Sequence, residues 1–177
     1  CSQDCAYCAQ SCRSNADIDT YKWVEDEKLY NDNDFVNEHH LSRHCIGLSG
    51  MGFTDAEIEQ LAGRIRKMKE TGTHLCCSIG FLTEKQAKML KDAGLDRINH
   101  NLNSSRNYYS HICTTHTFDQ RVENIHMLQR LGFEICRNIS NWRNTHQNAS
   151  DLSHMTKRYP ILKNTMKKAG EIMNVSD

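Results

Sequence analysis

The sequence predicts an α/β fold built on a parallel sheet. Three stretches carry a helix start signal and a glycine stop signal, and each glycine is followed by a short run typical of a strand. Strand and helix therefore alternate at roughly equal intervals, which is the pattern of repeated βαβ units. An open doubly wound sheet and a (β/α) barrel both fit that pattern. In either fold the carboxyl ends of the strands meet at one edge, where active sites are found.

Each predicted helix begins at a threonine that is followed three residues later by Glu or Gln, the arrangement of a capping box. The threonines and the glycines that end the helices pair up as Thr54 with Gly72, Thr83 with Gly94, and Thr117 with Gly132. Apolar residues recur at helical spacing between them. The strand-like runs cover residues 44–48, 73–80, 95–101 and 133–140.

The chain divides into residues 1–136, which follow this pattern, and a divergent tail of residues 137–177. The tail is polar and rich in Asn, and it offers one helix at about residues 152–173, broken near Pro160. Four strands are too few to close a barrel by themselves. Because the sequence opens on Cys1 and not on Met, we expect it to be an excised part of a longer protein.

Charge and hydropathy exclude several classes of function. The 22 basic side chains balance the 22 acidic ones, so there is no basic field for nucleic acid. No apolar run approaches the length of a membrane span, and no signal peptide precedes Cys1. We therefore expect no nucleic acid, no membrane and a cytoplasmic location.

Nine cysteines are present, and four of them fall within the first twelve residues: Cys1, Cys5, Cys8 and Cys12. Mutual disulfides are awkward at that spacing, so a metal site in a reducing compartment is favoured. Cys1, Cys5 and Cys8 place three thiolates on one tight loop, which suits a cubane iron–sulfur cluster with one iron left open to a cofactor. A zinc loop completed by Cys12 or a histidine is the alternative.

Several stretches carry a family resemblance. Residues 1–11 (CSQDCAYCAQS), 99–105 (NHNLNSS) and 112–118 (ICTTHTF), with the Arg-Val pair at 121–122, closely resemble the corresponding segments of biotin synthases. The C-x3-C-x2-C spacing is that of the radical S-adenosylmethionine superfamily. The resemblance runs from Cys1 to Cys136 and implies a partial (β/α) TIM-type barrel with parallel strands, lacking the first and last strands.

The resemblance implies cofactors and a reaction. A [4Fe–4S] cluster on Cys1, Cys5 and Cys8 would bind S-adenosylmethionine and cleave it to a 5′-deoxyadenosyl radical. In the family that radical takes hydrogen from dethiobiotin, and an inner [2Fe–2S] cluster donates the sulfur that completes biotin. Three cysteines match the ligand positions of this inner cluster: Cys45, Cys76 and Cys136. The strand that would carry its arginine ligand is absent, and Cys12, Cys77 and Cys113 match no ligand position.

Polar residues near the ends of the predicted strands complete the candidate site. Asn99, Asn101 and Asn103 alternate along one run, so we expect all three on the same face. The amides of all three suit a ribose hydroxyl or a ureido ring, so we expect them to bind the cofactor. By resemblance Asn101 and Asn103 contact the adenosyl ribose or the substrate, and Arg121 pairs with the methionyl carboxylate. A solvated surface arginine is the alternative for Arg121. His100, between two of the asparagines, should turn outward toward the helices as a packed residue, not a metal ligand.

The sequence departs from the family after Cys136, where Arg and Asn replace glycines that let the backbone approach a ligand. A shifted reading frame would account for this break. Three functions remain open: a biotin synthase that is incomplete as an isolated chain, a sister radical enzyme of other specificity, and a non-catalytic fragment that binds iron–sulfur or zinc. The first implies dethiobiotin, an electron-donor protein of the flavodoxin or ferredoxin type, and a possible homodimer.

Overall fold

A computed structural model describes residues 1–136 of the chain. The predictions for the tail, including its helix near residues 152–173, lie outside the described residues. The elements described below all belong to one compact unit.

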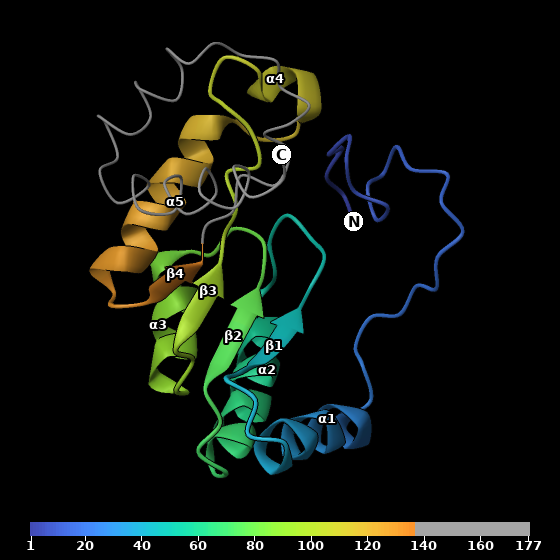
Figure 1. Ribbon diagram of the computed structural model, residues 1–177. Helices are drawn as coiled ribbons and strands as arrows, with labels where there is room; N and C mark the ends of the chain where they lie inside the picture. Colours follow the sequence, from blue (N-terminus) through green and yellow to red (C-terminus); the bar gives the residue numbers. More distant parts are fainter. Residues whose placement is uncertain (137–177) are drawn as a thin grey trace, which may run out of the picture. The chain divides into compact units, whose positions relative to one another are not determined.

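Four parallel strands form one sheet in the order β1-β2-β3-β4 (Figure 1). The strands are β1 (His44–Gly47), β2 (Leu75–Ser78), β3 (Arg97–Asn99) and β4 (Glu134–Cys136). Helices α2 (Asp55–Lys69), α3 (Glu84–Asp92) and α5 (Phe118–Arg130) connect them, as βαβ units require. The predicted α/β class with a parallel sheet is confirmed, and a four-stranded parallel sheet agrees with part of a (β/α) barrel.

The three long connecting helices begin where the sequence predicts. Thr54, Thr83 and Thr117 each accept a hydrogen bond from the backbone three residues on, and the Glu or Gln there reaches back to the threonine N–H. Each capping box thereby satisfies backbone donors that the helix itself leaves unpaired. The helices are followed by glycines with φ of 79°, 97° and 78° at Gly72, Gly94 and Gly132, a left-handed conformation that glycine adopts without strain.

Two helices were not predicted. The helix α1 (Asp26–Glu38) precedes β1, and the one-turn helix α4 (Tyr109–Ile112) lies in the segment between β3 and α5. The amino end of α1 has no side-chain cap, and only Leu29, Asn33 and Val36 on it are buried. The buried amide of Asn33 donates a hydrogen bond to Thr71 Oγ1 at 2.9 Å, in the turn after α2.

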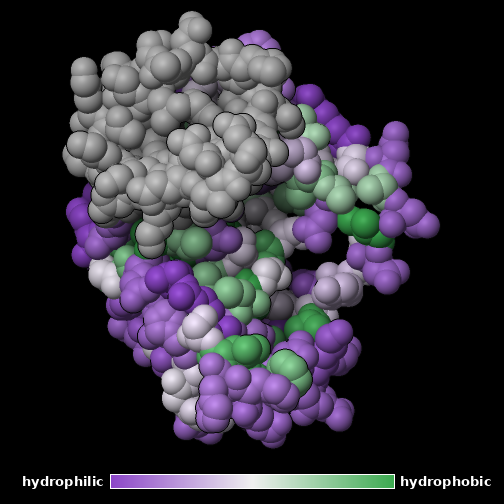
Figure 2. Space-filling model, in the orientation of Figure 1, coloured by the Kyte–Doolittle hydropathy of each residue, from purple (hydrophilic) through white to green (hydrophobic). Residues whose placement is uncertain are grey.

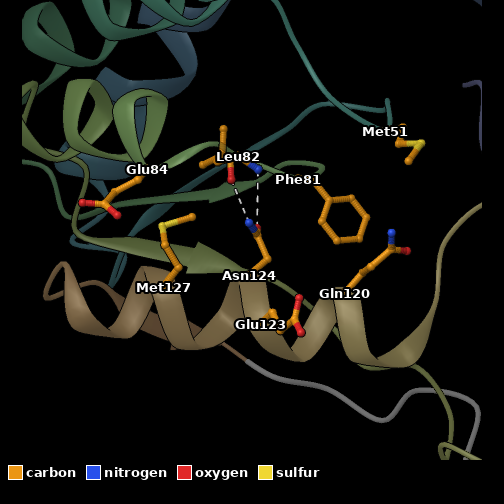
Figure 3. A pocket seen from close by; sticks show the side chains of 8 residues that line it. All are labelled: Met51, Phe81, Leu82, Glu84, Gln120, Glu123, Asn124 and Met127. Carbon is orange, nitrogen blue, oxygen red and sulfur yellow. Dashed lines mark hydrogen bonds between the residues drawn. The ribbon is translucent and has the colours of Figure 1, made fainter.

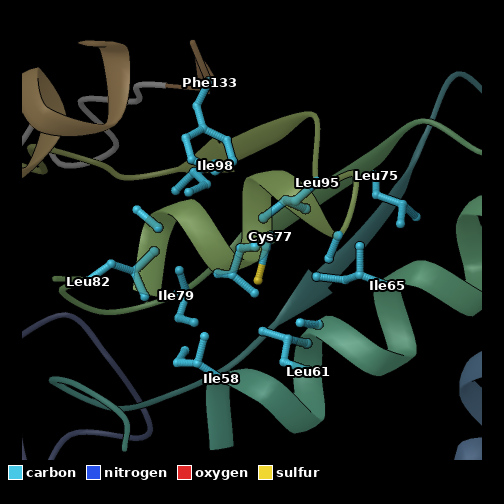
Figure 4. Packing of buried hydrophobic residues seen from close by; sticks show 14 of the residues in the cluster. Ile58, Leu61, Ile65, Leu75, Cys77, Ile79, Leu82, Leu95, Ile98 and Phe133 are labelled. Carbon is cyan, nitrogen blue, oxygen red and sulfur yellow. The ribbon is translucent and has the colours of Figure 1, made fainter. Parts of the chain in front are cut away.

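The two faces of the sheet differ in chemistry. Apolar side chains on one face pack against the helices in a single core, which includes Ile58, Leu61, Ile65, Leu75, Cys77, Leu90, Leu95, Ile98 and Leu128 (Figure 4). Because side chains alternate along a strand, the intervening residues point the other way. That opposite face, called the inner face below, carries Cys45, Cys76, Ser78, Arg97, Asn99, Glu134 and Cys136.

Hydrophilic side chains dominate the visible surface of the described residues, with scattered hydrophobic ones between them (Figure 2). Tyr21, Phe35 and Leu41 are the most exposed of the large apolar residues there. No helix of residues 1–136 is long and apolar enough to cross a membrane.

Candidate functional site

The amino-terminal thiol loop, residues 1–12, is attached to the segment that joins α4 to α5. Ala6 N donates to Ile112 O at 2.8 Å. The Asp4 carboxylate is buried and accepts from Thr114 N at 2.9 Å and Thr115 N at 3.2 Å. These hydrogen bonds, above all those from Thr114, hold the pKa of the Asp4 carboxyl well below its usual range. The thiol loop is thus held beyond the carboxyl ends of the strands (Figure 1).

The three predicted cluster ligands share this loop but differ in exposure. Cys5 is 6% exposed, Cys8 is half-buried and Cys1 is exposed. A turn brings Cys8 N to 3.2 Å from Cys5 O, so these two residues lie close together. Within residues 1–136, no three His, Cys, Asp or Glu side chains are arranged around a point where a metal ion would bind. The structure therefore supplies three free thiols on one loop, not a preformed metal cage.

The asparagine segment, residues 99–103, contacts the thiol loop. The amide of Asn103 donates to the hydroxyl of Tyr7, which lies between the two cysteines Cys5 and Cys8. The predicted strand alternation is wrong here, because β3 ends at Asn99 and Asn103 has a φ of 63°. Of the three asparagines, Asn99 is the one within β3, where it lies on the inner face, and its Oδ1 is buried with no hydrogen-bond partner among the described residues.

Arg121 is buried, which rules out the solvated alternative. It lies in the first turn of α5 and is 8% exposed. Its Nε donates to Tyr109 Oη at 3.0 Å, its Nη2 lies 2.8 Å from His116 Nε2, and its guanidinium covers the Phe81 ring at 5.2 Å. Burial, with Arg121 adding to the effect, lowers the pKa of His116 to about 4. The guanidinium and Cys5 are close enough to interact electrostatically.

His100 follows β3 and is fully buried. Its ring meets Phe81 edge to face at 5.5 Å and lies near Arg121 of α5, in agreement with the predicted packed position toward the helices. Neither ring nitrogen makes a hydrogen bond of good geometry in the described part of the chain, and the backbone of Ile79 is the one group there that favours the charged ring by a hydrogen-bond interaction. Burial is the main reason why the pKa of His100 falls to about 3.

The inner face brings the second set of predicted ligands together. Cys45 and Cys76 are register partners on β1 and β2, and Cys136 on β4 is paired with Asn99. Burial, reinforced by Cys45, raises the pKa of the Cys76 thiol to about 12. Arg97 is the register partner of Cys76 on β3, and its Nε donates to Glu134 Oε2 at 2.9 Å. A cation therefore lies beside these thiols.

A separate cavity of about 350 Å³ opens between α5 and the loop after β2 (Figure 3). Its lining includes Met51, Phe81, Glu84 and Asn124. The amide of Asn124 is already committed to the backbone of Leu82, donating to its carbonyl at 2.7 Å. No cysteine lines this cavity, so it lies apart from both sets of thiols.

Sequence reasoning missed several residues of the site: Asp4, Tyr7, Phe81, Tyr109 and Cys113. Asp4 and Tyr7 lie between the predicted cluster ligands in the sequence, and this position alone could have indicated that they belong to the site. Cys113 was set aside because it matches no ligand position, yet its Sγ lies 3.9 Å from Cys5 Sγ. A contact between residues 108 positions apart leaves no trace in local sequence patterns.

The fold and the thiol loop together define a class of protein. The sequence matches the radical SAM superfamily over residues 1–146, and the chain belongs to that superfamily. Members of the superfamily use a [4Fe–4S] cluster and S-adenosylmethionine.

Within the superfamily, the chain is similar to curated biotin synthases. That of Bacillus cytotoxicus is 41% identical over 137 residues, which are 77% of this chain and 41% of the relative. That of Bacillus cereus is 39% identical over the same shares. The chain thus spans about two fifths of the length of these relatives.

Solved structures share the fold. Methylornithine synthase aligns with a TM-score of 0.63 at 16% identity, over 77% of this chain and 40% of its own. HydG, a maturase of the [FeFe]-hydrogenase, aligns with a TM-score of 0.62 at 13% identity, over 90% of this chain and 38% of its own. At these identities the likeness concerns the fold alone.

Proposed function

We propose that the chain is the cluster-bearing part of a biotin synthase, an enzyme that inserts sulfur into dethiobiotin by radical chemistry. The observation that carries the proposal is the 41% identity to a biotin synthase over 137 residues. The match to the radical SAM superfamily over residues 1–146 includes both sets of cysteines. The alternative of a sister radical enzyme keeps the thiol loop but has no need of three cysteines on the inner face.

The thiol loop would hold the [4Fe–4S] cluster through Cys1, Cys5 and Cys8. Its donor set fits, because three free thiols leave one iron without a protein ligand. Buried polar atoms without partners in the described part of the chain, Gln3 Nε2 and Ser104 Oγ among them, remain available to a bound cofactor. When bound, the cluster supplies the electron that cleaves S-adenosylmethionine to a 5′-deoxyadenosyl radical.

The neighbouring side chains would bind and orient the cofactor. Arg121 offers a guanidinium beside Cys5, and Tyr109 and His116 hold it there. The amides of Asn99, Asn101 and Asn103 are suited to ribose hydroxyls or a ureido ring. Because Arg121 is buried, its positive charge acts on a carboxylate with less screening than at the surface.

The inner face would hold a [2Fe–2S] cluster through Cys45, Cys76 and Cys136. Support comes from the register, which places Cys45 beside Cys76 and turns Cys136 to the same face. Arg97 adds a positive charge beside Cys76, which offsets part of the rise that burial and Cys45 cause in the pKa of that thiol.

The proposal includes dethiobiotin as substrate, a flavodoxin or ferredoxin type electron donor, a cytoplasmic location and a possible homodimer. We expect the isolated 177-residue chain to bind iron and sulfide but not to turn over dethiobiotin, because the four strands of residues 1–136 do not enclose a substrate.

Anaerobic reconstitution with iron and sulfide tests the proposal. Two clusters, distinguished by Mössbauer spectra, are expected in the parent chain, and one in a variant with Cys45, Cys76 and Cys136 replaced by Ala. Cys5→Ala should abolish the other cluster, whereas Cys12→Ala, in the same loop, should not. A single cluster in the parent chain would favour the sister enzyme, and zinc alone or no metal would favour a non-catalytic remnant.

A further inference from the structure

Two buried thiols from distant parts of the chain lie in contact. The Sγ atoms of Cys5, in the thiol loop, and Cys113, directly after α4, are 3.9 Å apart. Cys5 is 6% exposed and Cys113 is 4% exposed. Hydrogen bonds between the thiol loop and residues 112–115 fix the two backbones relative to each other. The hydrogen bonds that attach the thiol loop therefore also bring the two sulfurs into contact.

The surroundings of Cys113 orient its sulfur. Arg121 only donates hydrogen bonds, so His116 Nε2 must accept from it at 2.8 Å. A neutral imidazole that accepts at Nε2 carries its proton on Nδ1. His116 Nδ1 then donates to Cys113 Sγ at 3.2 Å, and the thiol of Cys113 donates to Asp4 Oδ1 at 3.3 Å. Both hydrogen bonds hold Cys113 Sγ facing Cys5.

We propose that Cys5 and Cys113 are an oxidation site, at which a hydroperoxide forms a reversible disulfide when the thiol loop carries no iron. One thiol attacks the peroxide, the O–O bond breaks, and a sulfenic acid and water result. The second thiol then attacks the sulfenic sulfur, the S–S bond forms, and the hydroxyl leaves with a proton as a second water. Two thiols are oxidised and one hydrogen peroxide is reduced to two waters.

The geometry requires only a local movement. A disulfide is about 2 Å long, so the two sulfurs have to approach each other from 3.9 Å by side-chain rotation. Peroxide reaches the exposed thiols of Cys1 and Cys12 more easily, but the contact at 3.9 Å gives a sulfenic acid on Cys5 or Cys113 a partner thiol already in place. Cys45 and Cys76 face each other on neighbouring strands and form the one competing pair among the described residues that the register supplies.

The disulfide would take Cys5 away from the iron. An oxidised thiol loop then offers only Cys1 and Cys8, so peroxide would block cluster loading until a thiol reductant restores Cys5. This consequence rests on the function proposed above, but formation of the disulfide does not.

The test begins with the apo chain, purified without oxygen. The chain is treated with one equivalent of hydrogen peroxide, alkylated with iodoacetamide and digested, and its peptides are mapped by mass spectrometry. A cross-linked peptide joining Cys5 to Cys113, which dithiothreitol cleaves, is expected. Cys5 found alkylated, or joined to Cys1 or Cys8, would overturn the proposal, as would a map in which only Cys45 and Cys76 are joined.

Variants separate the disulfide from general oxidation damage. Cys113→Ser keeps a hydroxyl for Asp4 and His116 but removes the sulfur, whereas Cys12→Ser is the matched control in the thiol loop. After peroxide, the parent chain and the control should lose iron loading and Cys113→Ser should keep it. If the parent chain, Cys12→Ser and Cys113→Ser all lost iron loading equally, the loss would not depend on Cys113, and the proposal would be refuted. If the reduced chain never loads iron, the proposed function fails, and the peptide map still decides this inference.

Discussion

Acidification should destabilise the chain through His100. The ring is fully buried and lies against Phe81 and near the Arg121 guanidinium. Burial is the larger cause and Arg121 the second cause that lower its pKa from 6.5 to about 3, and the backbone of Ile79 offsets only a part. The folded chain therefore keeps His100 neutral, whereas the unfolded chain protonates it below about pH 6.5.

The sign and size of the change in the free energy of unfolding follow from the difference in pKa between the folded and unfolded chain. The folded pKa lies below the unfolded one, so the stability that depends on a neutral His100 is complete above about pH 6.5 and is lost as the pH falls toward about 3. One pH unit corresponds to about 1.4 kcal/mol. Between neutral pH and about pH 5, His100 should therefore lower the free energy of unfolding by about 2 kcal/mol.

Urea denaturation at several pH values measures this loss. Because burial also lowers the pKa of His44 and His116, the informative quantity is the difference between the parent chain and His100→Leu. The variant should lose about 2 kcal/mol less than the parent between neutral pH and about pH 5. Exposed His111, replaced by Gln, is the matched control and should follow the parent. Equal pH dependence in the parent and His100→Leu would refute a buried, neutral His100.

Four further predictions concern the fold, and each is measured as a change in the free energy of unfolding by urea. Gly80→Ala should destabilise by several kcal/mol, because the added methyl would overlap the backbone carbonyl of Gly50. Gly63→Ala, inside α2 with open space around the added methyl, should instead stabilise by about 0.5–1 kcal/mol, and a loss would show that the site is crowded. Thr117→Ala should cost about 1 kcal/mol through its capping box, and Leu90→Ala about 2–5 kcal/mol through a cavity in the core.

The sequence predicted those helices whose signals are local. A capping box and a terminal glycine specify α2, α3 and α5 through contacts within a few residues, and the structure has all three. The helix α1 lacks these signals, since Glu25 makes no side-chain cap and Asn and Asp are frequent within it. One of its three buried positions is Asn33, whose amide is satisfied by Thr71, so the apolar period was interrupted by a tertiary contact.

The asparagine segment shows where periodicity fails. Alternation holds only while the chain is extended, and β3 ends at Asn99. Asn103 then adopts a left-handed φ of 63°, a conformation that asparagine tolerates better than most residues, and turns its amide to Tyr7. The composition of the segment was informative about its chemistry, but the direction of each side chain depended on where the strand ended.

Register links the two sets of thiols. Asn99 is paired with Ser78 on one side and Cys136 on the other, and Cys76 lies two residues before Ser78. At about 3.3 Å per residue, Cys76 lies roughly 7 Å below the edge that faces the thiol loop. A slip of β2 by one residue would turn Cys77 inward and Cys76 into the core. Because Cys77 packs fully buried beside its register partner Ile98, burial of the apolar face also fixes the depth of Cys76 below that edge.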